Sequence, residues 1–348
     1  MSLGPIMLDV EGLELVAADR RLLREPAVGG VILLARNYAS PAQLADLISD
    51  IRAVRSPPLL IAVDHEGGRV QRFRDGFSAI PPMRELGRVF DGDRDEALVL
   101  AREVGWLIGA ELRASGIDLA LNPCCDLDWG LNEAIGDRAL HRQPDVVSAL
   151  AGEIALGLRS AGMVAVAKHF PGHGGVVADS HHALPVDRRE FGELLEDMSP
   201  FEHLVRRRLL GGVLMSHVVY ADVDPLPAGF SPYWMHEQLR AQLGFDGAIL
   251  SDDLSMRATQ QFGSMPVRAE KALKAGCDMV LICNDRSAAL AAVEHLGDYS
   301  NPLSLVRLAR LHGTGQPLRE TLLASDEWRV AAERLGGWLE PPILKLDA

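Results

Sequence analysis

The sequence predicts an α/β protein that folds as a single-domain (β/α)8 TIM barrel, and three observations support this fold class. Eight short aliphatic runs alternate with helical segments along the 348 residues. Each run is apolar at consecutive positions, which is typical of parallel strands that are buried on both faces. Several helical segments end at a glycine just before the next run, where glycine accepts the left-handed backbone conformation. An open, doubly wound sheet is the alternative arrangement of the same elements.

The expected elements follow from these runs and from helix caps. The strands are expected at residues 6–9, 31–35, 59–64, 117–122, 164–169, 212–217, 248–252 and 279–283. A serine–proline pair is typical of a helix start, because the serine caps the first turn and proline suits the first helical position. Such starts are expected at Ser40-Pro41 with Gln43, Ser199-Pro200 with Glu202, and Ser231-Pro232. The helix-ending glycines are Gly116, Gly162, Gly244 and Gly276.

The chain is expected to form one domain over residues 1–348. The segment from about residue 297 to 348 has no strand pattern of its own, and we expect it to pack on the barrel. The sequence contains no GxGxxG, GxxxxGK[ST] or GxSxG motif, which disfavours a dinucleotide-binding protein, a P-loop NTPase and a serine hydrolase.

Composition narrows the partners and the compartment. The formal net charge of −13 disfavours nonspecific binding to nucleic acid, which depends on Lys and Arg contacts to phosphate. The four cysteines show no zinc-type spacing and suit a reducing compartment. Neither a signal peptide nor a run of about 18 apolar residues is evident. We therefore expect a cytoplasmic protein without membrane insertion, without a nucleic-acid partner and without a cofactor.

Ionisable residues stand where several expected strands end. Asp64, Lys168-His169, His217 and Asp252 each occupy such a position. In a (β/α)8 barrel the carboxyl ends of the strands meet at one face and carry the active site. One polar residue at a strand end is usually a helix cap, but several together are costly to bury without a function.

The segment after the fifth expected strand, residues 168–182, is rich in glycine and histidine. Asp179 and His181 lie two positions apart, so a turn brings the carboxylate onto the imidazole, which is an arrangement for general acid–base catalysis. A solvated loop with a chance Asp-x-His is the alternative. A metal site is a second alternative, but no familiar ligand spacing is met and we expect no metal. The ligands considered for it are His169, His173, Asp179, His181 and His182.

Two adjacent carboxylates follow the seventh expected strand. Asp252 stands at the strand terminus, where its side chain is expected to face the barrel mouth and to serve as a nucleophile. Asp253 is followed by Leu254-Ser255-Met256, which fits a residue that caps the next turn.

Several of these motifs resemble the β-N-acetylglucosaminidase type of family 3 glycoside hydrolases. The main motif is KHFPGHG at residues 168–174, followed by Asp179-Ser180-His181. The similarity runs from about residue 4 to about residue 300. The other blocks that carry it are MLDVEG at 7–12, VDHEGGRVQRF at 63–73, IGDR at 135–138, FDG at 245–247, SDDLSM at 251–256 and AGCDM at 275–279.

The resemblance implies a retaining glycosidase with a covalent glycosyl-enzyme intermediate. It implies Asp252 as the nucleophile, His181 as the proton donor and acceptor, and Asp179 as the partner of His181. The residues that it implies for binding the sugar are Asp64, Arg72, Arg138, Lys168 and His169, with His217 and Met256 as two further candidates. The implied substrate is N-acetylglucosamine β-1,4-linked to anhydro-N-acetylmuramic acid, with or without a peptide, in cell-wall turnover.

This sequence departs from the family pattern at two places. His65 stands where a glutamine is common, and Cys124-Cys125 stands where an aliphatic pair is usual. Phosphorolysis by the same residues, a metal-dependent hydrolase and a sugar-binding barrel without catalysis are the competing functions. The expected assembly is a monomer or a weak dimer that acts on a small sugar substrate.

Overall fold

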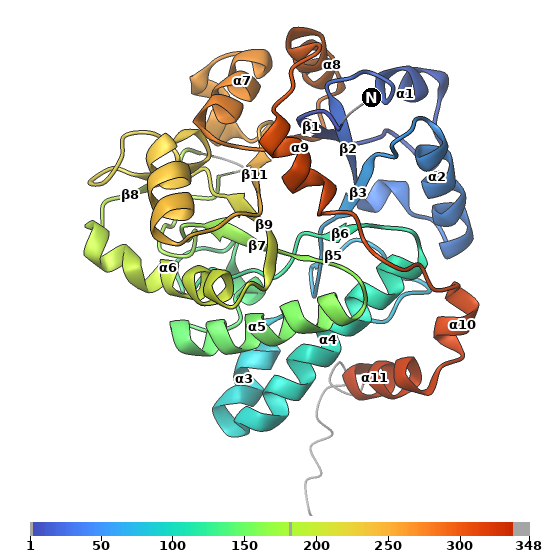
Figure 1. Ribbon diagram of the computed structural model, residues 1–348. Coiled ribbons are helices and arrows are strands. Elements are labelled where there is room, and N and C mark those ends of the chain that lie inside the picture. Colours follow the sequence, from blue (N-terminus) through green and yellow to red (C-terminus); the bar gives the residue numbers. More distant parts are fainter. Residues whose placement is uncertain (1–2, 181–182, 337–348) are drawn as a thin grey trace, which may run out of the picture.

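Eight parallel strands form the central sheet of the computed structural model, which describes residues 3–180 and 183–336 (Figure 1). Neighbouring strands follow the order β6–β3–β2–β1–β12–β11–β9–β7. All eight strands expected from the aliphatic runs are confirmed. They are β1 (Ile6–Leu8), β2 (Val28–Leu33), β3 (Leu60–Val63), β6 (Leu119–Ala120), β7 (Ala165–Phe170), β9 (Leu210–Met215), β11 (Ala248–Asp253) and β12 (Met279–Ile282).

The sheet closes on itself through the chain that follows β6. The amide of Val166 donates to the carbonyl of Asn122 at 2.9 Å, and the amide of Lys168 donates to the carbonyl of Pro123 at 3.1 Å. The amide of Cys125 in turn donates to the carbonyl of Lys168 at 2.7 Å. These bonds join β7 to the extension of β6, so the sheet is a barrel and the prediction of a (β/α)8 fold is confirmed over the open sheet.

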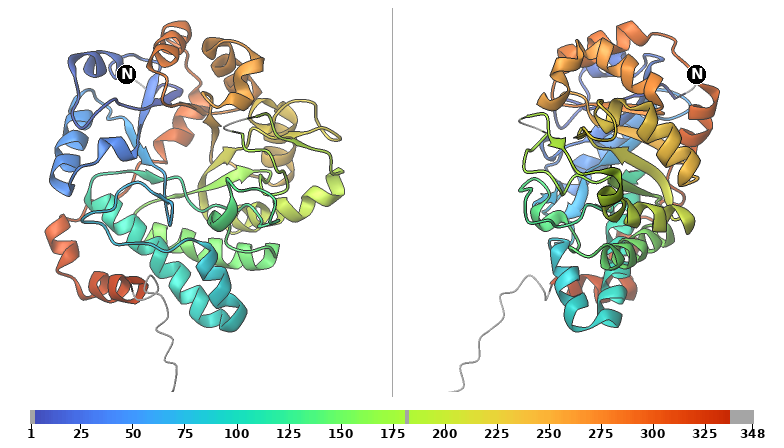
Figure 2. Two further views of the ribbon diagram at one scale, coloured as in Figure 1. Left: turned by 180° about the vertical axis from the view of Figure 1, so that it is seen from behind. Right: turned by 90° about the vertical axis from the view of Figure 1, so that its left-hand side faces the viewer.

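Helices surround the barrel, as the two further views show (Figure 2). The apolar faces of these helices and the outer face of the sheet form the larger core, while a second cluster fills the barrel interior. A π-helix at Tyr233–Gln242 follows β9. The other helices around the barrel are α1 (Ala17–Leu22), α2 (Pro41–Ala53), α3 (Arg84–Gly92), α4 (Arg94–Ala114), α5 (Pro144–Ser160), α6 (Phe191–Arg206), α7 (Met265–Ala275) and α8 (Arg286–Leu296).

The helix starts agree with the sequence at two places and differ at one. Ser40 caps α2 by accepting the amide of Gln43 at 3.2 Å, and Ser231 accepts the amide of Trp234 at the start of the π-helix. The expected start at Ser199-Pro200 is wrong, because α6 already begins at Phe191 and contains Pro200. Pro200 is buried in the core, so packing against the barrel overrides its usual place at a helix start.

The described part of the C-terminal segment lies against the barrel. The α9 helix (Pro302–Ala309) brings Leu308 to the cluster inside the barrel, and α11 (Asp326–Gly336) lies beside α4. The indole of Trp328 donates to Glu111 at 2.7 Å and ties α11 to α4. The α10 helix (Arg319–Leu323) lies between α9 and α11 in the chain. Among the described helices, none is long and apolar enough to cross a membrane.

Candidate active site

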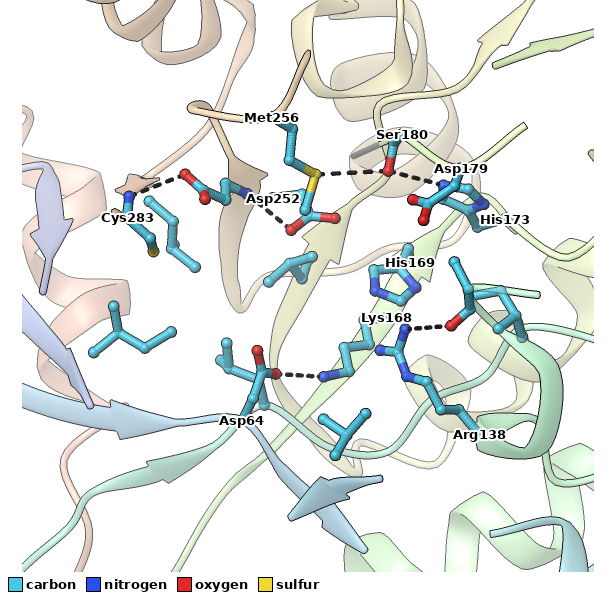
Figure 3. Close-up of a pocket in the computed structure, with 18 of the residues that line it drawn as sticks. Asp64, Arg138, Lys168, His169, His173, Asp179, Ser180, Asp252, Met256 and Cys283 are labelled. Carbon is cyan, nitrogen blue, oxygen red and sulfur yellow. Dashed lines mark hydrogen bonds and ion pairs between the residues drawn. The ribbon is translucent and has the colours of Figure 1, made fainter. Parts of the chain in front are cut away.

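A cavity of about 400 Å³ opens at the carboxyl ends of the strands (Figure 3). It collects side chains that follow β3, β7, β11 and β12, because the carboxyl ends of all strands in a barrel point to one face. Eight residues that the sequence nominated line it, namely Asp64, Arg72, Arg138, Lys168, His169, Asp179, Asp252 and Met256.

The other two nominated residues are His217 and His181. His217 is fully buried at the end of β9, and its Nε2 lies 3.3 Å from the carbonyl oxygen of Asp253. Within the part of the chain that the structure describes, it supports the strand end and does not line the cavity. His181 lies outside the described residues, so its role stays a prediction.

The floor of the cavity is a cluster of ion pairs centred on Glu66. Arg138 donates to both carboxylate oxygens of Glu66, at 2.9 Å and 2.8 Å. The ammonium of Lys168 forms a second ion pair with Glu66 and donates to Asp64 at 2.7 Å. Glu66 is 1% exposed and Lys168 is 2% exposed, so each charge depends on its partners in place of water. We refer to Asp64, Glu66, Arg138 and Lys168 as the charged floor.

The charges of the floor hold one another ionised. Burial raises the pKa of the Glu66 carboxyl, but Arg138 and Lys168 outweigh burial and hold that pKa well below its usual range. Burial lowers the pKa of Lys168, but Asp64 and Glu66 outweigh it and raise that pKa. The floor therefore presents fixed, ionised hydrogen-bond donors and acceptors to the cavity at neutral pH.

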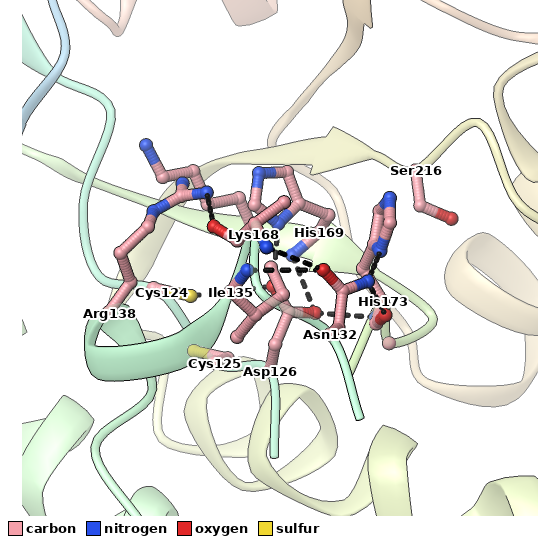
Figure 4. Close-up of polar contacts among 12 residues, drawn as sticks. Cys124, Cys125, Asp126, Asn132, Ile135, Arg138, Lys168, His169, His173 and Ser216 are labelled. Carbon is pink, nitrogen blue, oxygen red and sulfur yellow. Dashed lines mark hydrogen bonds and ion pairs between the residues drawn. The ribbon is translucent and has the colours of Figure 1, made fainter. Parts of the chain in front are cut away.

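Asp126 fixes the orientation of His169 beside the floor. Its Oδ2 lies 2.6 Å from Nδ1 of His169, and its Oδ1 accepts the amide of His173 at 2.7 Å (Figure 4). Burial raises the pKa of the Asp126 carboxyl, but His169 and His173 outweigh burial and hold that pKa well below its usual range. The imidazole of His169 is thereby held with its other edge toward the cavity, which it lines.

The glycines after β7 are required by close packing. A Cβ atom at Gly172 would lie 2.6 Å from Asp197, and one at Gly174 would lie 1.9 Å from the carbonyl oxygen of Leu127. A Cβ atom at Gly175 would lie 2.2 Å from the guanidinium of Arg189. Residues 171–176 are thus packed onto the barrel, whereas Val177 is 74% exposed.

The last described residues of this loop reach across the cavity. Ser180 lies with its hydroxyl 3.2 Å from Nε2 of His173 and 3.6 Å from the sulfur of Met256. The carbonyl of Ser180 accepts the amide of Ala258 at 3.1 Å. These contacts bring Asp179 to the wall of the cavity, opposite the charged floor (Figure 3).

The two adjacent carboxylates differ in what they bind. The Oδ1 of Asp253 accepts the amides of Ser255 and Cys283 at 2.9 Å and 3.0 Å, and its Oδ2 accepts the hydroxyl of Ser255 at 2.5 Å. Asp253 therefore caps the turn after β11, as the sequence suggested. Burial raises the pKa of Asp253 to about 6. Asp252 faces the cavity and accepts the amide of Asp253 at 2.8 Å.

Sequence reasoning gave no role to two residues that organise the site. Glu66 and Asp126 stand inside or beside quoted motifs, but neither was nominated. A signal was available, because the predicted binding residues Arg138 and Lys168 require a carboxylate partner if they are buried. For Asp126 the corresponding signal was His169, since an imidazole that must point into a cavity needs an acceptor behind it.

One mixed group of possible metal ligands lies under the cavity in the described part of the chain. It comprises Cys124, Asp126 and His169, and it differs from the histidine-rich group considered from the sequence. The four cysteines are buried and none forms a disulfide.

Comparison with known proteins agrees with this site. The profile described as "Glycosyl hydrolase family 3 N terminal domain" matches residues 7–307. A protein of Thioalkalivibrio sulfidiphilus named "Beta-hexosaminidase" is 51% identical over 347 residues, with 100% of both chains covered. A protein of the same name from Methylobacillus flagellatus is 51% identical over 338 residues and covers 97% of both chains.

A solved structure has the same fold over almost the whole length. It is NagZ from Neisseria gonorrhoeae in complex with N-trifluoroacetyl-D-glucosamine, with 39% identity, a TM-score of 0.93, and coverage of 98% of this chain and 99% of that chain. Together, the barrel, the ionised cavity and these matches define a glycoside hydrolase. The chain belongs to glycosyl hydrolase family 3, and the predicted β-hexosaminidase type within that family is confirmed.

Proposed function

We propose that the chain is a retaining exo-β-N-acetylglucosaminidase of cytoplasmic peptidoglycan recycling. Its substrate is N-acetylglucosamine β-1,4-linked to 1,6-anhydro-N-acetylmuramic acid, with or without a peptide. The full-length relatives named "Beta-hexosaminidase" and the N-acylated glucosamine in the similar NagZ structure support this substrate class. The enzyme acts on this small sugar as a monomer or weak dimer, without a cofactor, nucleic acid or membrane insertion.

One observation carries the proposed chemistry. The cavity has the Asp252 carboxylate on a strand end, Asp179 on the loop above, and a charged floor below. A protein that only binds sugar needs the charged floor, but it does not need the carboxylate nucleophile Asp252 together with Asp179 as the partner of an acid–base histidine. This arrangement favours a glycosidase over a sugar-binding barrel.

In the proposed reaction, Asp252 attacks the anomeric carbon while His181 gives a proton to the departing glycosidic oxygen. A covalent glycosyl-enzyme forms and the aglycone leaves as an alcohol. The neutral imidazole of His181 then takes a proton from water, and the resulting nucleophile hydrolyses the intermediate to regenerate Asp252. Asp179 stabilises the imidazolium form, which donates the proton in the first step and forms again when water is deprotonated in the second.

The charged floor serves binding in this mechanism. Asp64, Arg138 and Lys168 present ionised groups that accept or donate hydrogen bonds to sugar hydroxyls, and such bonds are stronger than those between neutral groups. Their mutual ion pairs hold them in place before substrate arrives. His169, oriented by Asp126, adds a further contact from the same side.

The decisive experiment is release of nitrophenol from an aryl β-N-acetylglucosaminide, measured beside the matching β-glucoside, with chelator and without phosphate. We expect turnover of the first substrate only, and the β-anomer of N-acetylglucosamine as the first product in a proton NMR time course. If a sugar phosphate forms, and only when phosphate is added, the enzyme is a phosphorylase and not a hydrolase. If no nitrophenol is released, the function that remains is a sugar-binding barrel.

A further inference from the structure

Three side chains of different chemistry meet directly under the floor of the cavity. Cys124, Asp126 and His169 each offer one ligand atom, and the three atoms lie within 4.8 Å of one another (Figure 4). Cys124 and Asp126 come from the chain after β6, and His169 comes from β7. The three residues are 1%, 0% and 7% exposed, so the group is shielded from bulk water.

The spacing of these atoms is close to that of ligands on one tetrahedral metal ion. Zinc–sulfur and zinc–oxygen bonds of usual length place a thiolate and a carboxylate about 3.6 Å apart. The sulfur of Cys124 lies 3.4 Å from Oδ2 of Asp126. The same Oδ2 lies 2.6 Å from Nδ1 of His169, and this pair needs to open by less than about 1 Å to admit the ion.

The set of ligands selects a class of ion. Thiolate, imidazole and carboxylate ligands together suit zinc and its spectroscopic substitute cobalt(II), whereas magnesium and calcium prefer oxygen ligands throughout. Charge agrees with this choice. Lys168 and Arg138 are engaged by Glu66, while Asp126 is paired with an imidazole and not with a lysine or arginine. A bound cation would therefore meet a carboxylate whose charge is not neutralised by a lysine or arginine.

We propose that Cys124, Asp126 and His169 bind a divalent cation of the zinc class beneath the sugar-binding cavity. Binding releases the thiol proton of Cys124 to solvent, and the proton that Nδ1 of His169 shares with Asp126 is transferred to Nε2, so that Nδ1 becomes a ligand. The ion reaches the group from the cavity, because His169 lines it. Binding draws His169 away from its present orientation and inhibits the enzyme, a consequence that rests on the proposed function.

The test uses cobalt(II) as the probe on the full-length protein after treatment with a chelator. A cobalt–thiolate bond gives a charge-transfer absorption in the near ultraviolet, which reports on cysteine ligation without any substrate. Cys124→Ser is the diagnostic variant. Cys125→Ser is the matched control, because Cys125 is the adjacent, equally buried cysteine and its sulfur lies 3.9 Å from the carbonyl of Pro123, outside the group.

We expect one cobalt per chain with thiolate absorption in the wild type and in Cys125→Ser. In Cys124→Ser we expect loss of that absorption and an affinity weakened about hundredfold or more, since outer-shell changes alone reach that size. Zinc is expected to inhibit the wild type and Cys125→Ser alike, and to inhibit Cys124→Ser only at correspondingly higher concentration. Normal nitrophenol release by Cys124→Ser without metal shows that the variant is folded.

Two results would overturn the proposal. If the thiolate absorption persists in Cys124→Ser, the cobalt is bound by another cysteine. If the wild type shows no thiolate absorption, any cobalt on the protein is an adventitious ion only. Both results come from absorption and not from turnover, so they stand even if the proposed glycosidase activity is not found. Zinc inhibition of equal strength in all three proteins would place the inhibitory ion elsewhere.

Discussion

The floor of the cavity and the loop above it are built in opposite ways. The floor consists of buried ion pairs that come from three separated segments, with Glu66 at the centre. The loop after β7 is packed through residue 176 and again at Ser180, whose hydroxyl lies 3.2 Å from His173, while Val177 between them is exposed. The residues proposed to bind the sugar are thus fixed by ion pairs, whereas Asp179, the proposed partner of the proton donor, stands between the exposed Val177 and the buried Ser180.

This difference indicates a division of labour. Ionised groups that hold one another in place bind a sugar without further ordering, which lowers the entropic cost of binding. Loops that close over a substrate bring catalytic groups into place, so we expect the proton donor carried on this loop to approach the leaving oxygen only when substrate is present. Breaking the floor should therefore affect stability and binding, whereas breaking the loop should affect turnover.

The largest effect is expected at the nucleophile itself. Asp252→Ala should lower kcat on the order of 10⁴-fold or more, because removal of a nucleophile abolishes the covalent route. The melting temperature should change little, since Asp252 faces the cavity. The matched control is Asp253→Asn, the adjacent carboxylate, which should keep most of its turnover. Turnover near the wild-type rate in Asp252→Ala would remove Asp252 from the mechanism.

His181→Ala tests the chemical end of the loop. General acid–base groups contribute about 10²- to 10⁴-fold, and the loss should be greatest on poor leaving groups, which need a proton to depart. Comparison of aryl substrates whose phenols span several pKa units measures this. The rate of the first step, formation of the glycosyl-enzyme, should fall least with activated nitrophenyl substrates. An equal loss across the whole series would argue against His181 as the acid.

Glu66→Gln should break the floor. The substitution keeps the shape of the side chain but leaves Arg138 and Lys168 buried without one of their negative partners, which costs about 3 to 5 kcal/mol. Urea unfolding should show a lower midpoint at unchanged m-value, and KM should rise more than kcat falls. A midpoint equal to that of the wild type would show that the ion pairs of the floor contribute no stability.

The same variant has a signature in acid. The pKa of Glu66 is held below its usual range in the folded protein, so its contribution to stability is present above the unfolded-state pKa of about 4.3 and is lost as the pH falls below it. Glu66→Gln should therefore lose stability less steeply than the wild type below about pH 4.

The strands and the barrel could be predicted from the sequence, because buried parallel strands and helix caps are local signals. The cavity residues Arg72, Arg138 and Met256 were instead implied by the resemblance to family 3 glycoside hydrolases. Glu66 and Asp126 could not be predicted, because the partners that define them are distant along the chain: Arg138 is 72 positions from Glu66. The helix start predicted at Ser199-Pro200 was wrong for a related reason. A serine–proline pair looks the same at a helix start and inside a helix, and only packing against the barrel separates the two.

Asp253→Asn is expected to change the pH dependence of stability. The pKa of Asp253 is raised to about 6, so the folded state binds this proton more tightly and stability falls as the pH rises from about 4 through 6. Asparagine keeps the acceptor that serves the amides of Ser255 and Cys283 but carries no charge. Thermal melts should show the variant gaining about 1 to 2 kcal/mol on the wild type across this interval. Parallel profiles would contradict a raised pKa.

The smallest effect is expected where the start of the loop and the segment after it meet on α6. Arg189 follows the loop, donates to Asp197 of α6 at 2.7 Å and lies against Gly175, while Gly172 at the start of the loop packs on the same Asp197. Both ends of the loop therefore converge on one carboxylate. If this contact sets where the loop stands, Arg189→Met should lower kcat about tenfold on poor leaving groups, which is about 1.4 kcal/mol, and leave KM within about twofold.

A purely structural role for Arg189 predicts a different pattern. It would lower the melting temperature without any dependence of turnover on the leaving group. Arg189→Lys should recover part of the rate, because lysine keeps the charge near Asp197 but not the planar fork. Arg142→Met is the matched control, since Arg142 stacks on Trp129, as Arg189 does, but pairs with Glu196. A leaving-group dependence in Arg142→Met equal to that in Arg189→Met would assign the effect to Trp129 and not to the contact with Asp197.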